Sequence, residues 1–211
     1  MFTGKTAVLK QYEYVLEASL MNYYDKHADS YISTTVSLDM SVQYSLFLPF
    51  LPQGGSILDA GCGSGRDSLW FLSQGYKVEA FDISSAMVEH AKALTGLAVR
   101  KLSFMELDYT SAFDGIWACA SLLHVPRTEL PAVFGLLHRA LKPQGLLYCS
   151  FKDREEDFST DGRSFTCFTE QGFQAFLSEL SFFELVQVSH SQDVREGRAD
   201  ERWLNVLIRK C

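Results

Sequence analysis

Three glycines alternate with small residues in the stretch "ILDAGCGSG", residues 57–65. Gly61, Gly63 and Gly65 carry no Cβ, so the backbone there can turn tightly and lie against a ligand. A short apolar run precedes the glycines and a helical pattern follows them, and a helix N-terminus offers free N–H groups and a partial positive charge. The stretch therefore predicts a loop that contacts a small molecule. A tight strand-to-helix turn without a ligand is the alternative.

A carboxylate stands where it can act together with this loop. Asp82 ends the next apolar run, "KVEAFD". In a doubly wound sheet that position lies beside the glycine loop, where the carboxylate can accept hydrogen bonds from a ribose diol or can cap the next helix. The glycines follow GxGxG and not the dinucleotide pattern GxGxxG. Asp59, just before them, suits a ligand end that carries an ammonium group better than a pyrophosphate.

Alternating strand and helix patterns must position these residues. Apolar runs and amphipathic helical patterns alternate from residue 56 onward, which predicts a doubly wound α/β fold with a mostly parallel sheet covered on both faces. The last two strand patterns have no helix between them, so we expect them to pair antiparallel at the sheet edge. The predicted strands are residues 56–60, 77–82, 98–102, 113–120, 146–151, 183–190 and 203–210.

Length and composition limit the possible classes of protein. The 211 residues suit one structural domain, with a helical cap at 1–50, including helices near Thr6–Met21 and Leu38–Phe50, packed on a core at 51–211. A net charge of −7 weighs against nucleic acid or anionic membranes as partners. We find no apolar run long enough for a membrane span and no signal-peptide pattern. Five scattered cysteines form no CxxC pair, so we expect no metal site, reduced thiols and a cytoplasmic location.

Four stretches in order carry a family resemblance: "ILDAGCGSG", "VEAFD", "FDGIWACASLLHV" and "LKPQGLLYCSF". They closely resemble the class I S-adenosylmethionine-dependent methyltransferases, over about residues 23–210. Within that class, "GSGRDSLWFLSQGYKVEAFDISSAMV" is similar to the small bacterial tellurite-resistance and thiopurine-type enzymes. The resemblance implies a Rossmann-like seven-stranded sheet in the order 3-2-1-4-5-7-6 with strand 7 antiparallel. It also implies S-adenosylmethionine as cofactor and S-adenosylhomocysteine as product.

The resemblance also implies the cofactor contacts. Asp82 matches the acid that binds the ribose hydroxyls, and Asp59 the acid that acts on the amino group through water. Ser103 stands where many relatives have Asp, so backbone groups of Phe104 could serve the adenine instead. Arg66 could pair with the cofactor carboxylate or with a surface acid such as Asp67. The expected cofactor-binding residues are Asp59, Ala60, Gly61, Cys62, Gly63, Gly65, Arg66, Asp82, Ile83, Met87, Ser103, Phe104, Ala118, Cys119, Tyr24 and Tyr31.

Several of these residues have two possible roles. Tyr24 and Tyr31 are either aromatic lids over the cofactor or anchors for the N-terminal helices. Cys119 is favoured as a small packed thiol over a nucleophile, because methyl transfer passes directly from sulfonium to acceptor. His124 is the candidate general base, since its unperturbed pKa is near neutrality, but the preferred reading is a structural histidine.

The acceptor side is less defined. Arg154 and Glu155 lie in the charged run at 152–158 after the fifth predicted strand, and with Arg163 they are candidate acceptor contacts. The predicted function is methyl transfer to an oxygen, nitrogen, sulfur or metalloid atom of a small molecule by a monomer or homodimer. The alternatives are a methyltransferase that acts on RNA or protein, a nucleotide-cofactor oxidoreductase, and a non-catalytic cofactor-binding module.

Overall fold

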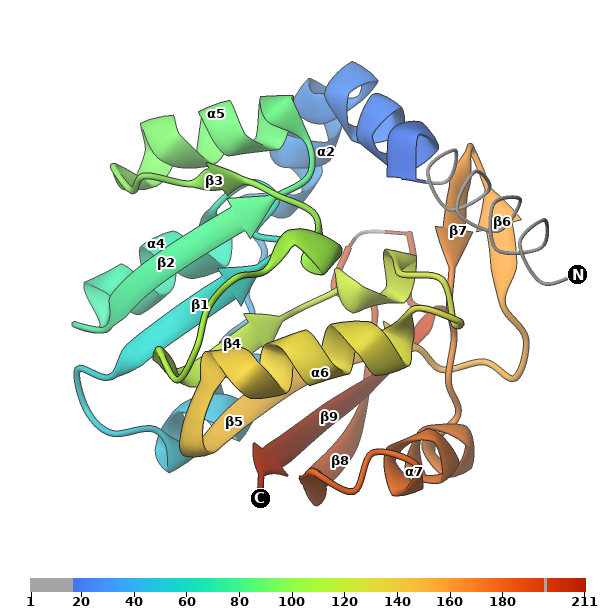
Figure 1. Cartoon of the computed structure of the whole chain (residues 1–211). Coiled ribbons are helices and arrows are strands. Elements are labelled where there is room, and N and C mark those ends of the chain that lie inside the picture. The colour runs from blue at the N-terminus through green and yellow to red at the C-terminus, as the bar shows by residue number, and fades with distance from the viewer. Residues whose placement is uncertain (1–16, 196) are drawn as a thin grey trace, which may run out of the picture.

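A seven-stranded sheet forms the centre of the protein. The structure is a computed structural model that describes residues 17–195 and 197–211 (Figure 1). Within them the strand order is β3-β2-β1-β4-β5-β9-β8, and β9 runs antiparallel to both of its neighbours. Since β8 and β9 are the sixth and seventh strands of this sheet along the chain, the predicted order 3-2-1-4-5-7-6 is confirmed. The strands are β1 Ser56–Ala60, β2 Lys77–Asp82, β3 Arg100–Lys101, β4 Phe113–Ala118, β5 Leu141–Lys152, β8 Phe183–Gln192 and β9 Arg202–Lys210.

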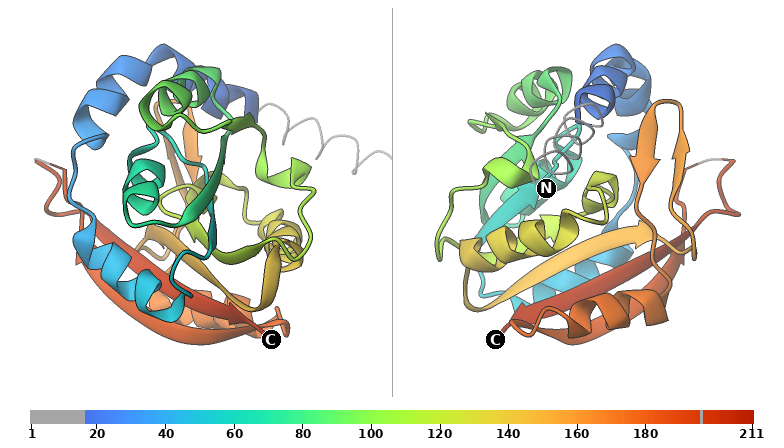
Figure 2. Two further views of the ribbon diagram at one scale, coloured as in Figure 1. Left: turned by 90° about the vertical axis from the view of Figure 1, so that its left-hand side faces the viewer. Right: turned by 45° about the vertical axis from the view of Figure 1, so that its right-hand side comes forward.

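Helices cover both faces of the sheet, as the alternating pattern predicts (Figure 2). Strand residues alternate between the faces: Ile116 joins the hydrophobic cluster under α6 and α7, whereas Trp117 joins the cluster under α3 and α4. Trp117 stacks on Tyr148 of the neighbouring strand, with ring centroids 4.0 Å apart. The α-helices are α2 Ala28–Thr35, α3 Ser41–Phe47, α4 Arg66–Ser73, α5 Ser85–Thr95, α6 Leu130–Ala140 and α7 Glu170–Ser178, and the 3-10 helices are η1 Leu48–Phe50, η2 Phe104–Glu106 and η3 Leu122–His124.

Local sequence explains where these helices begin and end. The Ser84 hydroxyl accepts a hydrogen bond from the Met87 backbone N–H and caps α5, and Gly96 ends that helix at φ 74°. In α6 the apolar residues at helical spacing are buried against the sheet. Among the helices of the described residues, none combines the length and apolarity that crossing a membrane requires.

The N-terminal segment is more helical than expected. Residues 17–26 are helical, and α2 follows them. Both lie partly or wholly in residues 22–35, an aromatic and polar segment in which apolar residues show no clear helical spacing. The helix expected at Leu38–Phe50 is present as α3 and η1, whereas most of the helix expected near Thr6–Met21 lies outside the described residues. The division into a cap at 1–50 and a core at 51–211 stays a prediction.

A second difference is a hairpin after β5, in a segment for which the sequence pattern predicts no strand. Strands β6 Phe158–Thr160 and β7 Arg163–Phe165 pair antiparallel, with Asp161 and Gly162 in the turn at φ 51° and 74°. The paired Phe158 and Phe165 rings stack at 4.6 Å and 5°. This two-residue turn and one aromatic cross-strand pair stabilise the hairpin, which is too short to show an alternating pattern in the sequence.

The hairpin rises beside the N-terminal helical residues (Figure 1). The Ser19 hydroxyl donates a hydrogen bond of 2.7 Å to the Gly162 carbonyl in the hairpin turn. A third difference concerns the stretch "LKPQG", residues 141–145, which precedes the fifth predicted strand. The structure makes it the start of β5, because Leu141 already pairs with Phe113 of β4.

Candidate active site

A cavity of about 550 Å³ lies at the carboxyl ends of the central strands. Its volume is within the range of roughly 300–1,000 Å³ that is typical of small-molecule sites. The N-terminal helical residues, the loops after β1, β2 and β4, the β6–β7 hairpin and the end of the β8–β9 hairpin all contribute to its wall. The predicted site residues that line it are Tyr24, Tyr31, Gly61, Cys62, Gly63, Arg66, Asp82, Ile83, Met87, Ser103, Phe104, Cys119, His124, Arg154 and Arg163.

Five predicted site residues lie outside this wall. Ala60 and Ala118 are fully buried in the sheet, and a Cβ on Gly65 would meet Ala91 of α5 at 3.0 Å. Glu155 lines a separate cavity of about 270 Å³ that also includes Arg127, so its contact with an acceptor stays a prediction.

Asp59 is the fifth of these residues, and it lies beneath the glycine loop. Its Oδ2 accepts a hydrogen bond of 2.6 Å from the Ser68 hydroxyl, and the side chain is almost fully buried. Burial, followed by the nearby Asp67 carboxylate, raises the pKa of Asp59. Asp59 therefore connects β1 to α4. Its carboxylate could interact with a ligand only through another group, such as a water molecule.

The three loop glycines have different tasks. All three have positive φ angles, a conformation that residues with a Cβ rarely adopt. A Cβ on Gly61 would lie 2.5 Å from Cβ of Ser121, so this glycine permits close packing between the loops after β1 and β4. A Cβ on Gly63 would have only Tyr31 Cε1 nearby, at 3.6 Å, and would project into the cavity. Gly63 is thus the point where the loop leaves room for a ligand.

The carboxylate of Asp82 holds the glycine loop against the next helix. Its Oδ2 accepts the Gly63 backbone N–H at 2.9 Å, and its Oδ1 accepts the Ser84 backbone N–H at 2.9 Å. Burial raises its pKa, whereas these backbone hydrogen bonds act in the opposite direction. Each carboxylate oxygen has a second lone pair, so Asp82 can still accept hydrogen bonds from a ligand.

The next part of the wall is apolar. Ile83 and Met87 follow Asp82, and Phe104 packs edge-on against Phe81 with centroids 5.2 Å apart. Ser103 forms a capping box with Glu106: its hydroxyl accepts the Glu106 backbone N–H, and its own backbone N–H donates to the Glu106 carboxylate at 2.8 Å. Ser103 therefore positions η2, which presents Phe104 to the cavity.

Arg66 forms a buried network with Asp67, its partner in one of the two predicted alternatives. Its guanidinium donates to both Asp67 oxygens, at 2.6 and 2.8 Å, and Asp67 also accepts from the Tyr44 hydroxyl at 2.6 Å and the Trp117 indole at 2.9 Å. The sequence-based description of Asp67 as a surface acid is wrong, because its exposed fraction is 6%. Burial alone would raise its pKa, but the Arg66 charge and these donors hold the pKa below its usual range.

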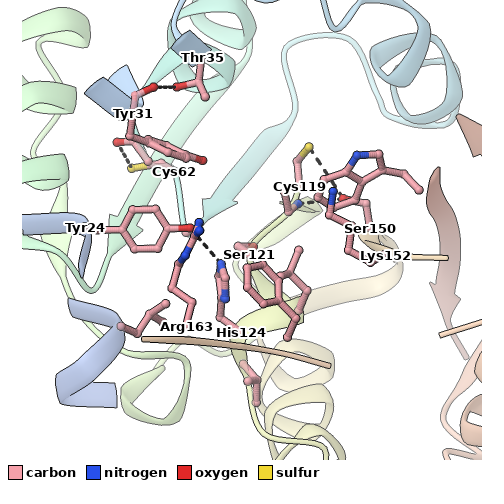
Figure 3. Close-up of a pocket in the computed structure, with 18 of the residues that line it drawn as sticks. Tyr24, Tyr31, Thr35, Cys62, Cys119, Ser121, His124, Ser150, Lys152 and Arg163 are labelled. Atoms are coloured by element: carbon pink, nitrogen blue, oxygen red, sulfur yellow. Dashed lines mark hydrogen bonds between the residues drawn. The ribbon is translucent and has the colours of Figure 1, made fainter. Parts of the chain in front are cut away.

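Tyr24 meets His124 at the other end of the cavity (Figure 3). The phenol oxygen lies 3.0 Å from Nε2 of His124, and Nδ1 lies 3.0 Å from the Ser164 carbonyl. A carbonyl only accepts, so Nδ1 carries the proton and Nε2 accepts the Tyr24 hydroxyl. Burial is the main cause that lowers the pKa of His124 to about 4, so the ring is neutral at neutral pH. Tyr31 packs edge-on against Tyr24, with centroids 5.1 Å apart.

Cys119 lines the cavity where β4 ends. Its Sγ lies 4.0 Å from the Ser150 hydroxyl, which also accepts the Ala120 backbone N–H at 2.8 Å. Burial, followed by the charge of Asp67, raises the pKa of Cys119 to about 12. A protonated thiol is a poor nucleophile, and this geometry agrees with a packed side chain.

Two residues of the site region were missed by the sequence analysis. Asp25 accepts hydrogen bonds from the Ser84 hydroxyl at 2.6 Å and the Ala86 backbone N–H at 3.1 Å, and so fastens the N-terminal helical segment to α5. Lys152 is buried, pairs with Asp193 and Glu201, and lies 3.8 Å from the centre of the Trp203 ring. The sequence around Asp25 contains no pattern that would predict its contacts with α5. Lys152 begins the charged run at 152–158, and its burial follows only from the path of β8 and β9.

Comparisons with known proteins agree with this geometry. Residues 57–145 match the family model described as a methyltransferase domain. The Bacillus subtilis protein YqeM is 28% identical over 156 residues, which cover 63% of this chain and 62% of YqeM. The methyltransferase GfsG of Streptomyces halstedii is 34% identical over 104 residues, 44% of this chain and 36% of GfsG. The chain thus spans less than two thirds of the length of these relatives.

Solved structures share the fold. The 1,6-didemethyltoxoflavin-N1-methyltransferase of Burkholderia thailandensis, solved with 1,6-didemethyltoxoflavin and S-adenosylhomocysteine, superimposes with a TM-score of 0.77 at 24% identity over 95% of this chain and 89% of that one. A methyltransferase from Methanosarcina mazei gives a TM-score of 0.69 at 22% identity over 82% and 98% of the two chains. Residues 57–145 thus match a methyltransferase domain, and the chain shares the fold of solved S-adenosylmethionine-dependent methyltransferases.

Proposed function

We propose that this protein transfers a methyl group from S-adenosylmethionine to a small-molecule acceptor. One observation carries the proposal: the open face of Gly63, the Asp82 carboxylate and the Tyr24–His124 pair all line the same cavity. A cofactor seated on the glycine loop would thus share one enclosed space with its acceptor. Such an arrangement aligns two reactants and lowers the entropic part of the barrier.

The residues of the cavity fit the proposed cofactor. The missing Cβ of Gly63 leaves space beside Tyr31, and the free lone pairs of Asp82 suit a ribose diol. Ile83, Met87 and Phe104 offer an apolar slot for a purine ring. When bound, S-adenosylmethionine supplies a methyl group that the adjacent sulfonium makes electrophilic.

The N-terminal helical segment would exclude water during the reaction. Three of its residues form hydrogen bonds with the rest of the protein: Asp25 with the start of α5, Tyr24 with His124, and Ser19 with the turn of the β6–β7 hairpin. All three contacts are hydrogen bonds between parts of the chain that are distant in sequence. Opening this segment would admit the reactants, and closing it would keep the nucleophile desolvated.

We assign His124 a positioning role in place of that of a general base. Its Nε2 already accepts the Tyr24 hydroxyl, and a pKa of about 4 makes it a poor proton acceptor at neutral pH. The ring instead joins Tyr24 to the Ser164 carbonyl of the β6–β7 hairpin. The N-terminal helical segment and the β6–β7 hairpin are thereby held together.

Size, charge and relatives support a small acceptor. The cavity wall includes the N-terminal segment, which leaves a volume suited to a small molecule, and the net charge of −7 disfavours RNA. The Burkholderia enzyme is named for the compound 1,6-didemethyltoxoflavin, and an O-methyltransferase of Aspergillus sclerotiorum is 35% identical over 95 residues.

Calorimetry with S-adenosylhomocysteine tests the proposal. We expect binding to the purified protein and a rise in melting temperature that follows RT ln(1 + [L]/Kd), with no such effect of NADH. Binding of NADH alone would favour an oxidoreductase instead. A mass-spectrometric screen of small acceptors would follow. Cofactor binding with methylation of RNA or protein, but of no small molecule, would contradict the acceptor class.

A further inference from the structure

The β6–β7 hairpin carries an arginine into the cavity. Arg163 lies beside Tyr24 and His124 (Figure 3). Its guanidinium carbon is 3.9 Å from the centre of the Tyr23 ring and 5.3 Å from that of Phe165, and only 12% of the side chain is exposed. The hairpin therefore places a largely buried positive charge where an acceptor would lie.

The charge of Arg163 is poorly neutralised by the described part of the chain. Its carboxylate neighbour there is Asp161, at 3.5 Å, and 68% of the Asp161 side chain is exposed. Its Nε is buried and has no hydrogen-bond partner among the described residues. An exposed ion pair contributes little to the stability of the fold, whereas a buried hydrogen-bond donor without a partner lowers that stability. Arg163 thus has both charge and hydrogen-bonding capacity left for a ligand.

The surroundings of Arg163 are aromatic. Phe165 beneath it stacks on Phe158 at 4.6 Å, and the guanidinium of Arg154 lies 4.6 Å from the centre of the Phe158 ring on the hairpin. The Tyr24 hydroxyl is also close to the arginine (Figure 3). A conjugated ring would pack on such a surface, and an attached anionic atom would reach the guanidinium.

We propose that Arg163 binds the ionised hydroxyl of a planar, conjugated acceptor, which makes the substrate class a phenol or enol. The inference rests on the proposed methyltransferase function and names its acceptor. Because His124 is engaged and neutral, the acceptor is deprotonated before transfer by its own acidity, increased by the arginine.

The resulting reaction needs no protein base. The acceptor proton leaves to solvent when the phenolate or enolate binds beside Arg163. A lone pair of the ionised oxygen forms the new bond to the methyl carbon, while the carbon–sulfur bond breaks and its electron pair stays on sulfur. The negative oxygen and the positive sulfonium both become neutral, so charge and protons balance.

A chromogenic phenol tests the inference without turnover. We would titrate 4-nitrophenol with the protein saturated with S-adenosylhomocysteine and follow phenolate absorbance against pH. An opposite charge within about 4–6 Å lowers the pKa of an acid by ~1–3 units. We therefore expect the bound phenol to ionise at least one pH unit below the free compound, which means at least tenfold tighter binding of phenolate than of phenol. No binding at millimolar concentration, or an unshifted pKa, would overturn the proposal.

Three variants assign the effect to the arginine. Arg163→Gln should abolish the shift, and Arg163→Lys, which keeps the charge, should restore part of it. Arg100→Gln removes a charge outside the cavity and should leave the shift unchanged. An equal shift of the phenol pKa in wild type and Arg163→Gln would contradict the proposal.

Cofactor binding separates this inference from the proposed function. If S-adenosylhomocysteine does not bind the wild type, the proposed function itself fails. Arg163→Gln should bind it within twofold of wild type, which also shows that the variant is folded. A tenfold loss for S-adenosylhomocysteine with no loss for 5′-methylthioadenosine, which lacks the amino-acid part, would place Arg163 on the cofactor carboxylate and overturn the assignment to the acceptor.

Discussion

The hydroxyl of Tyr24 donates a 3.0 Å hydrogen bond to Nε2 of His124, a residue 100 positions later in the chain. This bond joins the N-terminal helical segment to the loop after β4, directly over the cavity (Figure 3). It fixes the neutral tautomer of His124, because Nδ1 donates to the Ser164 carbonyl. The His124 side chain therefore connects the N-terminal helical segment, the loop after β4 and the β6–β7 hairpin.

Removal of the Tyr24 hydroxyl should change the acidity of His124. Tyr24→Phe deletes the hydrogen bond that favours the neutral ring, so the pKa of His124 should rise from about 4. Loss of a partner for the buried Nε2 should also cost about 1–3 kcal/mol of stability. NMR titration of the ring nitrogens measures the first effect and urea unfolding the second. In Tyr23→Phe, the matched control, both quantities should stay at their wild-type values; a response equal to that of Tyr24→Phe would contradict the assignment.

The buried His124 should make stability fall in mild acid. Its pKa is about 4 in the folded protein and 6.5 without perturbation, so the unfolded chain binds more protons between these values. The stabilisation is complete above pH 6.5 and is lost as the pH falls toward 4, by roughly 2–3 kcal/mol. Denaturant unfolding at several pH values should show a steeper decrease for wild type than for His124→Gln. Parallel curves would mean that this histidine is not buried as a neutral ring.

Gly63 and Gly96 form a matched pair for testing the ligand loop. Both have positive φ, so substitution by alanine should cost about 1–2 kcal/mol of stability at either place. The new Cβ at Gly63 would enter the cavity, whereas at Gly96 nothing lies within 4 Å. Gly63→Ala should therefore weaken S-adenosylhomocysteine binding at least tenfold by calorimetry, and Gly96→Ala should not. Equal affinities for the two variants would show that the loop does not touch the ligand.

Asp82 should act on both loop and cofactor. Asp82→Asn keeps the size of the side chain but removes the charge that accepts the Gly63 and Ser84 N–H groups. We expect a loss of about 1.5–3 kcal/mol in affinity for S-adenosylhomocysteine, as for a lost charge-assisted contact. Glu79→Gln, on the same strand but outside the cavity, is the control. Unchanged calorimetric affinity in Asp82→Asn would refute the role in cofactor binding.

Asp67 should be one of the most sensitive positions for stability. Asp67→Asn leaves the buried Arg66 without its carboxylate and turns an amide N–H toward existing donors. The expected loss is about 3–5 kcal/mol, as for other broken buried pairs. Asp108→Asn, which breaks the exposed pair with Arg100, should cost less than about 1 kcal/mol. Similar unfolding midpoints for both variants would contradict the importance of the network.

Much of the fold follows from local patterns that the sequence displays. The strand–helix alternation, the missing Cβ atoms in residues 61–65 and the placement of Asp82 at a strand end are all periodic or positional features. They predict the parallel sheet and the position of the loop, and the structure has both. The strand order came with the family resemblance. The β6–β7 hairpin escaped prediction because two three-residue strands are too short for a period to show.

The sequence by itself determined the sheet, the glycine loop and the carboxylate beside it, because each depends on residues that are near neighbours in the chain. Tertiary structure alone decided which polar groups face the cavity. Asp59 is tied to Ser68, Arg66 to Asp67, and Arg163 reaches the space beside His124 on an unpredicted hairpin. The site as a whole depends on packing between segments as far apart in the chain as Ser19 and Gly162, where burial and hydrogen-bond partners set the charge state of each side chain.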